Sequence, residues 1–220
     1  MTDASAGSLE VSGQLMYAAV VSRLERYLAR LPNGVDSYPD VVVKASTFTA
    51  CIADKPLHIR RGQVPAPIEK LILMPPLVSA WVPEVHMVSI FKLIGDHHFE
   101  GRGGTEAFLE WVYDQNRKLL GGKLYRALFW LLNPEAVFRG VEQRWGTFRR
   151  GTSLSIVQRS ARHAIFEFRY PRHLLDDEGL LAISTALRAA GEAAGAKRTA
   201  IELVDVSPVL GHVRMDWVPP

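Results

Sequence analysis

Apolar residues in the first half of the chain recur at the three- and four-residue spacing that is typical of helices. One such stripe runs from residue 14 to residue 31, and the Pro-Asn-Gly sequence at 32–34 ends it. The segment 41–53 begins with three valines and is compatible with either a strand or a buried helix, because its spacing favours neither. The chain therefore begins with a mainly helical part.

Prolines, glycines and charges mark the ends of several further helices. Pro at the first turn favours a short helix over 67–74 and a longer one over 83–94. The segment 105–120 has acids early, bases late and two glycines just beyond it, which are the signals of one complete helix. Two more helices are predicted within 124–132 and 133–150, the second one opening on Asn-Pro-Glu.

The pattern changes from helical spacing to alternation after Gly151. Two alternating segments, 153–160 and 163–170, are separated by a short turn and predict a hairpin. An acid-started, alanine-rich helix over 176–196 follows, and then a second alternating pair over 199–218. This order predicts an α+β fold, in which a helical N-terminal part packs on a C-terminal ββαββ antiparallel four-stranded sheet.

Length and composition fit one domain. The 220 residues are 48% hydrophobic and 22% charged, which is ordinary for a globular protein. We expect a disordered N-terminus over 1–13 and a single α+β domain over 14–220, mainly helical over 14–150 and ββαββ over 151–220. No apolar run approaches the ~20 residues that span a bilayer, and no secretory signal is apparent, so we expect a cytoplasmic protein without a membrane span.

Positive charge is concentrated in the middle of the chain. The segment 117–172 contains twelve Lys and Arg against three acids, a net charge of +9, so the rest carries −6 of the total of +3. Arginines interleaved with aromatic residues are compatible with binding nucleic acid or acidic lipid, but they are also typical of a solvated face. Binding of an anionic partner through 117–172 is therefore an alternative hypothesis.

No motif for catalysis or metal binding is complete. In GDHHFEGRGGTEAF, residues 95–108, the glycine spacing differs from that of a phosphate-binding loop, and adjacent histidines point in different directions. We predict no metal site and interpret 95–104 as a loop before a helix. The single cysteine, Cys51, lies in an apolar setting that favours an inert thiol. His86 lies alone among apolar residues, which is more typical of a core edge than of a haem ligand.

An enzyme is the second hypothesis. Its acid and base groups would come from the loops 95–104 and 170–178 and would have to meet in one cleft. The candidates are His97, His98, Glu100 and His173, together with Asp176 and Asp177. Because no serine occupies a nucleophile elbow and no other catalytic constellation is visible, we assign no catalytic residue and expect a protein that is not an enzyme.

Two stretches resemble a known arrangement, namely VFRGVEQRWGTFRRGTSLSI at 137–156 and AAGEAAGAKRTAIELVDVSPVLGHVRMDW at 189–217. Together with the order of elements over 85–218, they are similar to the ligand-binding superfamily that groups vinyl-reductase-type, TRAPP-like and haem–nitric-oxide-binding domains. They look closest to a myxobacterial family of paralogous proteins. The resemblance implies a pocket between helices and sheet that holds a hydrophobic ligand, usually in a sensory or scaffolding role.

The haem-binding branch of this superfamily uses a Tyr-x-Ser-x-Arg motif and a proximal histidine. This chain lacks the motif, and the nearest string, Ser155 to Arg159, departs from it. We therefore do not carry His86 over as a ligand, and we expect no cofactor. The residues that we expect to bind the ligand are Trp111, Phe129, Trp145, Arg149, Phe166 and Phe168. The prediction is a non-enzymatic sensory or regulatory domain that binds a small hydrophobic ligand or a protein partner, with a homodimer left open.

Overall fold

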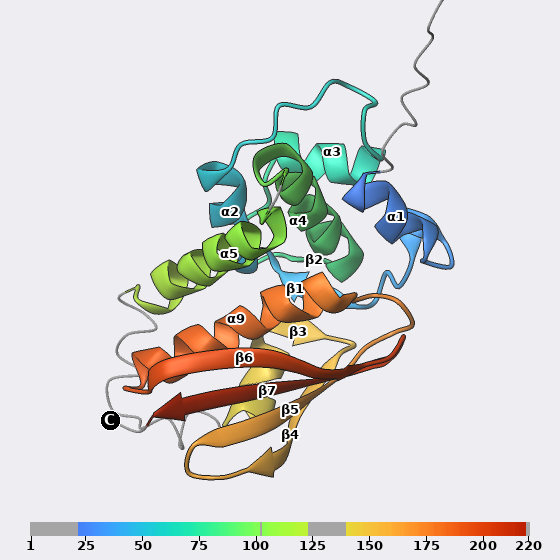
Figure 1. The fold of residues 1–220 in the computed structure, drawn as a ribbon. Coiled ribbons are helices and arrows are strands. Elements are labelled where there is room, and N and C mark those ends of the chain that lie inside the picture. The colour runs from blue at the N-terminus through green and yellow to red at the C-terminus, as the bar shows by residue number, and fades with distance from the viewer. Residues whose placement is uncertain (1–21, 102, 123–139, 219–220) are drawn as a thin grey trace, which may run out of the picture.

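The computed structural model describes residues 22–101, 103–122 and 140–218. In Figure 1, helices make up the upper part of the molecule and a sheet forms its base. The helices are α1 (Arg23–Ala29), α2 (Thr49–Asp54), α3 (Ala66–Leu73), α4 (Glu84–His98), α5 (Gly104–Leu120), α8 (Val141–Phe148) and α9 (Asp177–Ala193), with 3-10 turns η1 (Gly34–Asp36) and η2 (Ala45–Thr47). The strands are β1 (Val42–Lys44), β2 (Trp81–Pro83), β3 (Arg149–Arg150), β4 (Ser153–Arg159), β5 (His163–Arg169), β6 (Lys197–Val206) and β7 (Leu210–Val218).

The base of the molecule is an antiparallel sheet of four strands in the order β4-β5-β7-β6. Side chains alternate between its faces, and Phe166, Phe168 and Val213 all lie on the buried face with at most 1% of their surface exposed. Phe166 lies directly opposite Val213 in the β5–β7 pairing. The predicted fold class, with helices packed on an antiparallel ββαββ sheet, is confirmed.

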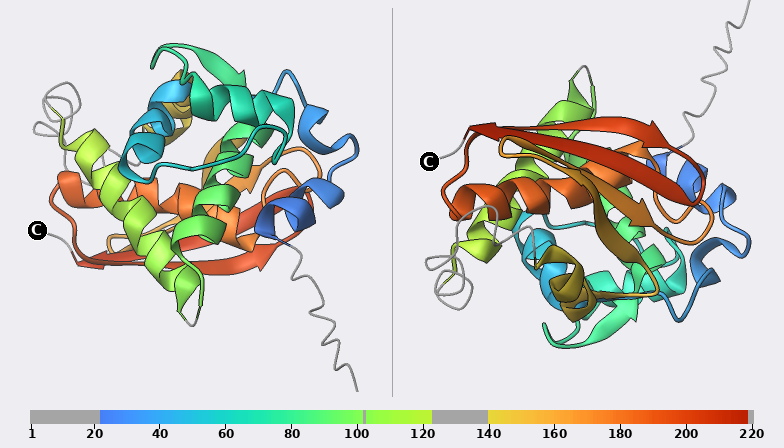
Figure 2. Two further views of the ribbon diagram at one scale, coloured as in Figure 1. Left: turned by 90° about the horizontal axis from the view of Figure 1, so that it is seen from above. Right: turned by 90° about the horizontal axis from the view of Figure 1, so that it is seen from below.

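Helix α9 lies between the sheet and the helical part. It packs against β6 and β7 on one side and against α5 on the other, as the views in Figures 1 and 2 agree. The helix starts at Asp176, whose side chain accepts a hydrogen bond of 2.8 Å from the Gly179 amide. Leu180 then packs so closely on Gly211 of β7 that a side chain at Gly211 would collide with it. The α9 backbone is thereby fixed over the sheet.

A second, smaller sheet joins the two parts of the chain. Strand β1 pairs antiparallel with β2 on one edge and with β3 on the other. The segment 41–53, whose spacing is compatible with a strand or a helix, contains both, because β1 is followed by η2 and α2. Strands of two or three residues are too short to show alternation, so this sheet was not predicted.

Several helix ends differ from the predicted ones: α8 ends at Phe148, before β3, and α9 ends at Ala193. The differences at α1 and α4 concern the site most. Helix α1 begins at Arg23, because Ser22 is extended and forms a capping box with Glu25, whereas the predicted residues 14–21 lie outside the described part. Helix α4 continues to His98 instead of ending at Ile94. Gly95 lies within this helix, and the Arg23 guanidinium occupies the space that a side chain at Gly95 would need.

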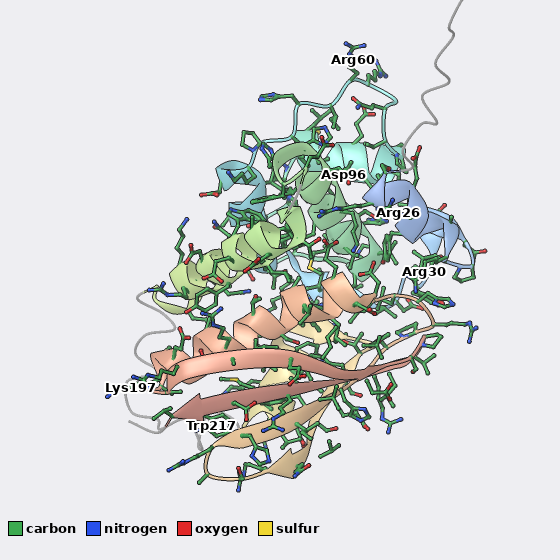
Figure 3. All side chains as sticks on the ribbon, viewed as in Figure 1. Arg26, Arg30, Arg60, Asp96, Lys197 and Trp217 are labelled. Carbon is green, nitrogen blue, oxygen red and sulfur yellow. The ribbon has the colours of Figure 1, made fainter. Side chains whose placement is uncertain are left out.

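Buried apolar side chains from both parts form one cluster, to which Trp217 near the end of β7 belongs (Figure 3). Of the helices that the structure describes, none combines the length and apolarity needed to cross a bilayer. The predicted disordered residues 1–13 lie outside the described part.

Candidate functional site

A cavity of about 400 Å³ lies where α4, α5, α8 and α9 meet. Side chains of α2 and of the turn before it also reach it. Apolar side chains provide most of its wall, among them Phe91, Phe108, Val112 and Trp145. The volume falls within the range of about 300–1,000 Å³ that is typical of small-molecule sites. The cavity is therefore the candidate site.

Helix α9 contributes a continuous stripe to the cavity. Besides Glu178, the α9 residues that line the cavity are Gly179, Ala182, Ile183, Ala186, Leu187 and Ala190. Their spacing of three and four residues places them on one face of the helix. Four of the six are glycine or alanine, so α9 leaves space in front of α5 that larger side chains would fill.

Aromatic rings cover the wall built by α4 and α5. Phe91 and Phe108 line the cavity, and their ring centroids lie 6.3 Å apart at an angle of 73°. Trp111 and Phe99 extend the same cluster behind them. Such edge-to-face packing holds the rings in fixed positions, so this wall is rigid and apolar.

A buried ion pair reaches the cavity at the start of β3. Arg149 is 8% exposed and lines the cavity, and its Nη1 donates to Oε1 of Glu84, the fully buried first residue of α4. The Nη2 group contacts the thioether of Met87, at 3.9 Å, and the guanidinium lies 5.1 Å from the Trp145 ring centre. Oε2 of Glu84 has no hydrogen-bond partner among the described residues. Burial lowers the pKa of Arg149 to about 9, which leaves it charged at neutral pH.

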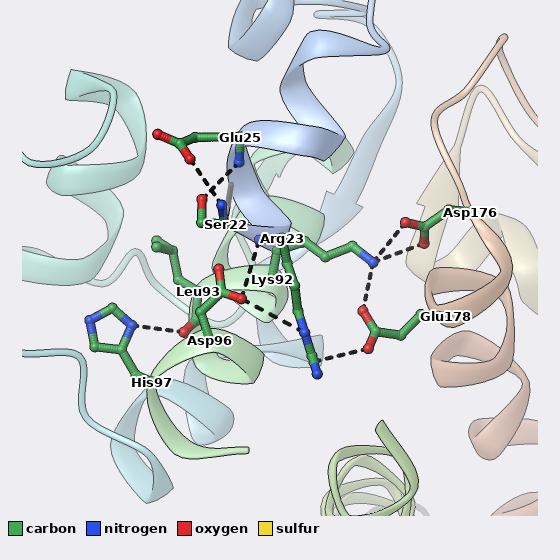
Figure 4. Close-up of polar contacts among 9 residues, drawn as sticks. All are labelled: Ser22, Arg23, Glu25, Lys92, Leu93, Asp96, His97, Asp176 and Glu178. Atoms are coloured by element: carbon green, nitrogen blue, oxygen red, sulfur yellow. Dashed lines mark hydrogen bonds and ion pairs between the residues drawn. The ribbon is translucent and has the colours of Figure 1, made fainter. Parts of the chain in front are cut away.

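A second group of charges lies beside the cavity where α1, α4 and α9 meet (Figure 4). Lys92, whose side chain is 5% exposed, contacts both Asp176 oxygens, at 2.8 and 2.9 Å, and Oε2 of Glu178 at 2.7 Å. Arg23 donates to Glu178 at 2.9 Å and lies 3.7 Å from Asp96. We call these five residues the Lys92 network. They connect the helical part to the first turn of α9.

Two amide side chains of α5 add polar groups to the cavity wall. Asn116 donates to Oγ1 of Thr185 at 2.8 Å. Nε2 of Gln115 is buried and makes no hydrogen bond of normal geometry within the described part, although its side chain contributes to lowering the pKa of Asp54. The main cause of that lowering is the hydrogen bond from Trp111, at 2.8 Å. Most of the α5 wall is therefore apolar, with polar groups in its second half.

Cys51 lines the cavity from α2 as a neutral thiol. Burial, and then the charge of Asp54, raise the pKa of the thiol to about 12. Because the thiolate is the nucleophile and the metal ligand, Cys51 is unreactive at neutral pH. This agrees with its apolar sequence setting.

The residues that we expected to bind a ligand lie in three places. Trp145 and Arg149 line the cavity. Trp111 lies behind Phe108, with ring centroids 6.1 Å apart. Phe166 and Phe168 lie in the core of the sheet, where Phe168 meets Trp145 edge to face at 5.7 Å. Phe129 lies outside the described residues.

The acid and base candidates of the enzyme hypothesis contact separate parts of the chain. His97 donates to the Leu93 carbonyl at 2.9 Å, and His98 to the Pro56 carbonyl at 3.0 Å. The backbone N–H of His173 donates to the Pro208 carbonyl, in the turn between β6 and β7. Glu100 follows the end of α4. Nothing in these contacts brings the four side chains to one cleft.

The basic segment is largely committed to internal contacts in the described part. Arg149 is buried, Arg150 stacks on Trp81 at 4.1 Å, and Arg169 pairs with Glu167 at 2.7 Å. These contacts have a structural role of their own, and binding of an anionic partner through 117–172 stays a prediction. Within the described ranges, no group of three or more His, Cys, Asp or Glu is placed to hold a metal ion.

Reasoning from the sequence missed Lys92, Glu84 and the α9 stripe. A lysine within the apolar run SIFKLI and small residues repeating at helical spacing in GLLAISTALRAA are the signals that would have found Lys92 and the stripe. Both signals become visible only when the lysine and the small residues are plotted by their position around the helix axis.

The fold is similar to that of solved H-NOX proteins, the haem–nitric-oxide-binding branch of the superfamily. The Fe(II) unliganded H-NOX protein from K. algicida matches with a TM-score of 0.52 and 8% identity, over 80% of this chain and 97% of that one. A single-residue mutant of the same protein matches with a TM-score of 0.52 and 9% identity, over 80% and 96%. A structure from work on haem redox potential and porphyrin distortion matches with a TM-score of 0.47 and 8% identity, over 68% of this chain and 87% of that one.

No family model and no curated protein matches the chain. The similarity to H-NOX proteins supports the coarser resemblance, an H-NOX-like fold, while the resemblance to the myxobacterial family stays a prediction. The expectation of no cofactor is wrong in the light of this comparison, because the K. algicida protein that shares the fold carries Fe(II). The Tyr-x-Ser-x-Arg motif, on which that expectation depended, is a local feature that a fold can lack.

Proposed function

We propose that this protein is a sensory or regulatory domain that binds a small apolar molecule in the cavity between α4, α5, α8 and α9. The carrying observation is the cavity itself, which has the volume of a small-molecule site and an apolar wall. The fold supports the proposal, since it is similar to that of the H-NOX protein from K. algicida. A non-enzymatic role is part of the proposal, because His97, His98 and His173 contact separate parts of the chain.

Haem is the first candidate ligand to consider, because the H-NOX fold implies it. All seven histidines are at described positions, and none is among the described residues that line the cavity. His86 bonds to the backbone of Val35 instead, and burial lowers its pKa despite that contact. Cys51 lines the cavity, and burial raises the pKa of its thiol to about 12. A haem ligated by histidine therefore does not fit the described lining.

The cavity can be tested with Nile red, a neutral dye that fluoresces in apolar surroundings. We expect the native protein to bind it and Ala186→Phe, which places a ring in the α9 stripe, to bind it at least about tenfold more weakly. Ala107→Phe, on the exposed face of α5, is the matched control and should bind like the native protein.

Ala182→Leu provides a second variant if the larger ring disturbs folding. Circular dichroism checks that each variant keeps the native fold. A native protein that does not bind the dye, or folded Ala186→Phe and Ala182→Leu variants that bind it as well as Ala107→Phe does, would overturn the proposal.

A further inference from the structure

The two buried cations at the cavity differ in how many acceptors they have. An ammonium group has three N–H donors, and Lys92 meets three carboxylate oxygens with them. A guanidinium has five donors, but Arg149 meets one carboxylate oxygen, of Glu84, and one thioether, of Met87. Within the described part, Lys92 is therefore saturated, whereas Arg149 has donor capacity left on the cavity wall.

The pair that Arg149 forms with Glu84 is incomplete on both sides. Arginine and carboxylate usually pair through two parallel hydrogen bonds, and here a single oxygen of Glu84 accepts while Oε2 has no partner among the described residues. A buried pair of this kind contributes little to stability, because desolvation opposes the attraction. Its geometry instead leaves Nη2 against a soft, weakly accepting sulfur atom.

The charged side chains of the cavity wall are mainly positive. Among the described lining residues, the cations are Lys92, Lys118, Arg144 and Arg149, and the one carboxylate is Glu178. Glu178 is bound by Lys92 and Arg23. An anionic group on the guest thus meets a positive wall, and Arg149 is the lining cation that is buried and incompletely paired.

We propose that the guest is an apolar carboxylic acid, whose hydrocarbon body lies along the α9 stripe and whose carboxylate accepts a hydrogen bond from Nη2 of Arg149. This inference rests on the proposed function, since it names the class of molecule that the same cavity binds. A charge-assisted hydrogen bond is strong in a dry site, and the aromatic wall of Phe91 and Phe108 excludes water from the hydrocarbon body.

The test compares two probes that differ only in their head group. Dodecanoic acid and 1-dodecanol are titrated against Nile red bound to the native protein, at neutral pH. We expect the acid to displace the dye at a concentration at least about tenfold lower than the alcohol, because a hydrogen bond to a charged group is lost with the alcohol.

The double variant Glu84→Gln/Arg149→Met removes the guanidinium without leaving a buried carboxylate behind. We expect it to bind 1-dodecanol as the native protein does and to lose the preference for the acid. Glu84→Gln alone is the matched control and should keep that preference. If both probes displace the dye equally from the native protein, or if the double variant keeps the preference, this inference is wrong while the proposed function stands.

Haemin is the third probe, because its carboxylates are another source of the same chemistry. If haemin displaces Nile red and the displacement requires Arg149, the cavity recognises a carboxylate, and a porphyrin can supply it. Displacement by haemin alone, without any by dodecanoic acid, would contradict a linear acid. If no probe displaces the dye and the dye itself does not bind, the proposed function has failed first.

Discussion

Two buried groups of charge touch one cavity, and they are built differently. In the Lys92 network, one ammonium group meets three carboxylate oxygens, and Arg23 ties Glu178 of that group to α1 (Figure 4). The Arg149–Glu84 pair has a single hydrogen bond between its partners and, among the described residues, an oxygen without one. The Lys92 network thus holds helices together, whereas the Arg149–Glu84 pair keeps hydrogen-bond donors that a ligand in the cavity can use.

The difference follows from where the residues lie. The Lys92 network joins three helices, so its contacts resist separation of the helical part from α9. Arg149 and Glu84 begin β3 and α4 respectively, next to the three-stranded sheet that already joins these segments. The second pair is therefore not needed for that connection.

The largest effect is expected for Lys92→Met. The substitution leaves Asp176 and Glu178 with fewer cations in a partly buried place, so the free energy of unfolding should fall by about 3–5 kcal/mol. Urea unfolding followed by circular dichroism measures it. A second substitution, Asp176→Asn, should restore little, because Glu178 and the rest of the network stay unbalanced. Full recovery in the double variant would show that the network is an isolated pair.

The Arg149–Glu84 pair should behave in the opposite way. Arg149→Met alone leaves the carboxylate of Glu84 buried without a cation, and we expect a loss of about 3 kcal/mol. The double variant Glu84→Gln/Arg149→Met should regain most of it, because two neutral side chains of similar size need no charge partner. The same urea experiment decides it. Additive losses in the double variant would contradict the separation between the two groups.

Acid should weaken the Lys92 network selectively. Burial raises the pKa of Asp176, but the charge of Lys92 and the hydrogen bonds from Lys92 and Gly179 lower it more, to below its ordinary value of 3.8. A carboxyl with a lower pKa in the folded state contributes stability above its unfolded pKa, and this is lost as the pH falls through the folded value. The free energy of unfolding of the native protein should therefore fall below pH 3.8 more steeply than that of Asp176→Asn. Parallel curves would contradict this role.

The smallest effect is expected for Lys118→Met. Lys118 also lines the cavity, but its side chain is 64% exposed and lies 3.4 Å from Asp54. Exposed pairs are screened by water, so the free energy of unfolding should change by less than about 0.5 kcal/mol. A larger change in the same urea experiment would mean that the exposure of a charged side chain does not determine its contribution to stability around the cavity.

The sheet was predictable from the sequence, and the site was predictable only in part. Each of β4, β5, β6 and β7 has seven to ten residues, and in β5 and β7 buried residues alternate regularly with more exposed ones. The end of α4 was not predicted, because Gly95 was read as the start of a loop, whereas it lies inside the helix and leaves room for Arg23, 72 positions earlier in the chain. Contacts between distant residues leave no local pattern.

The cofactor expectation failed for a related reason. It depended on a five-residue motif, whereas the similarity to H-NOX proteins lies in the arrangement of elements at 8% identity. Trp145 and Arg149 were named from the sequence and do line the cavity, but the incomplete pairing of Arg149 depends on Glu84, which no spacing connects to it. The sequence indicated which residue types are suited to binding a ligand, whereas their contact partners became known only from the structure.

The methyl groups of α9 have a consequence for the evolution of selectivity. Ala182, Ala186 and Ala190 follow one another at intervals of four residues, or about 6 Å along the helix axis. A bulky residue at each of these positions would close the space at a different distance from Arg149, and the charged groups would stay as they are. Relatives of this chain could thus prefer shorter or longer molecules after a single codon change in α9.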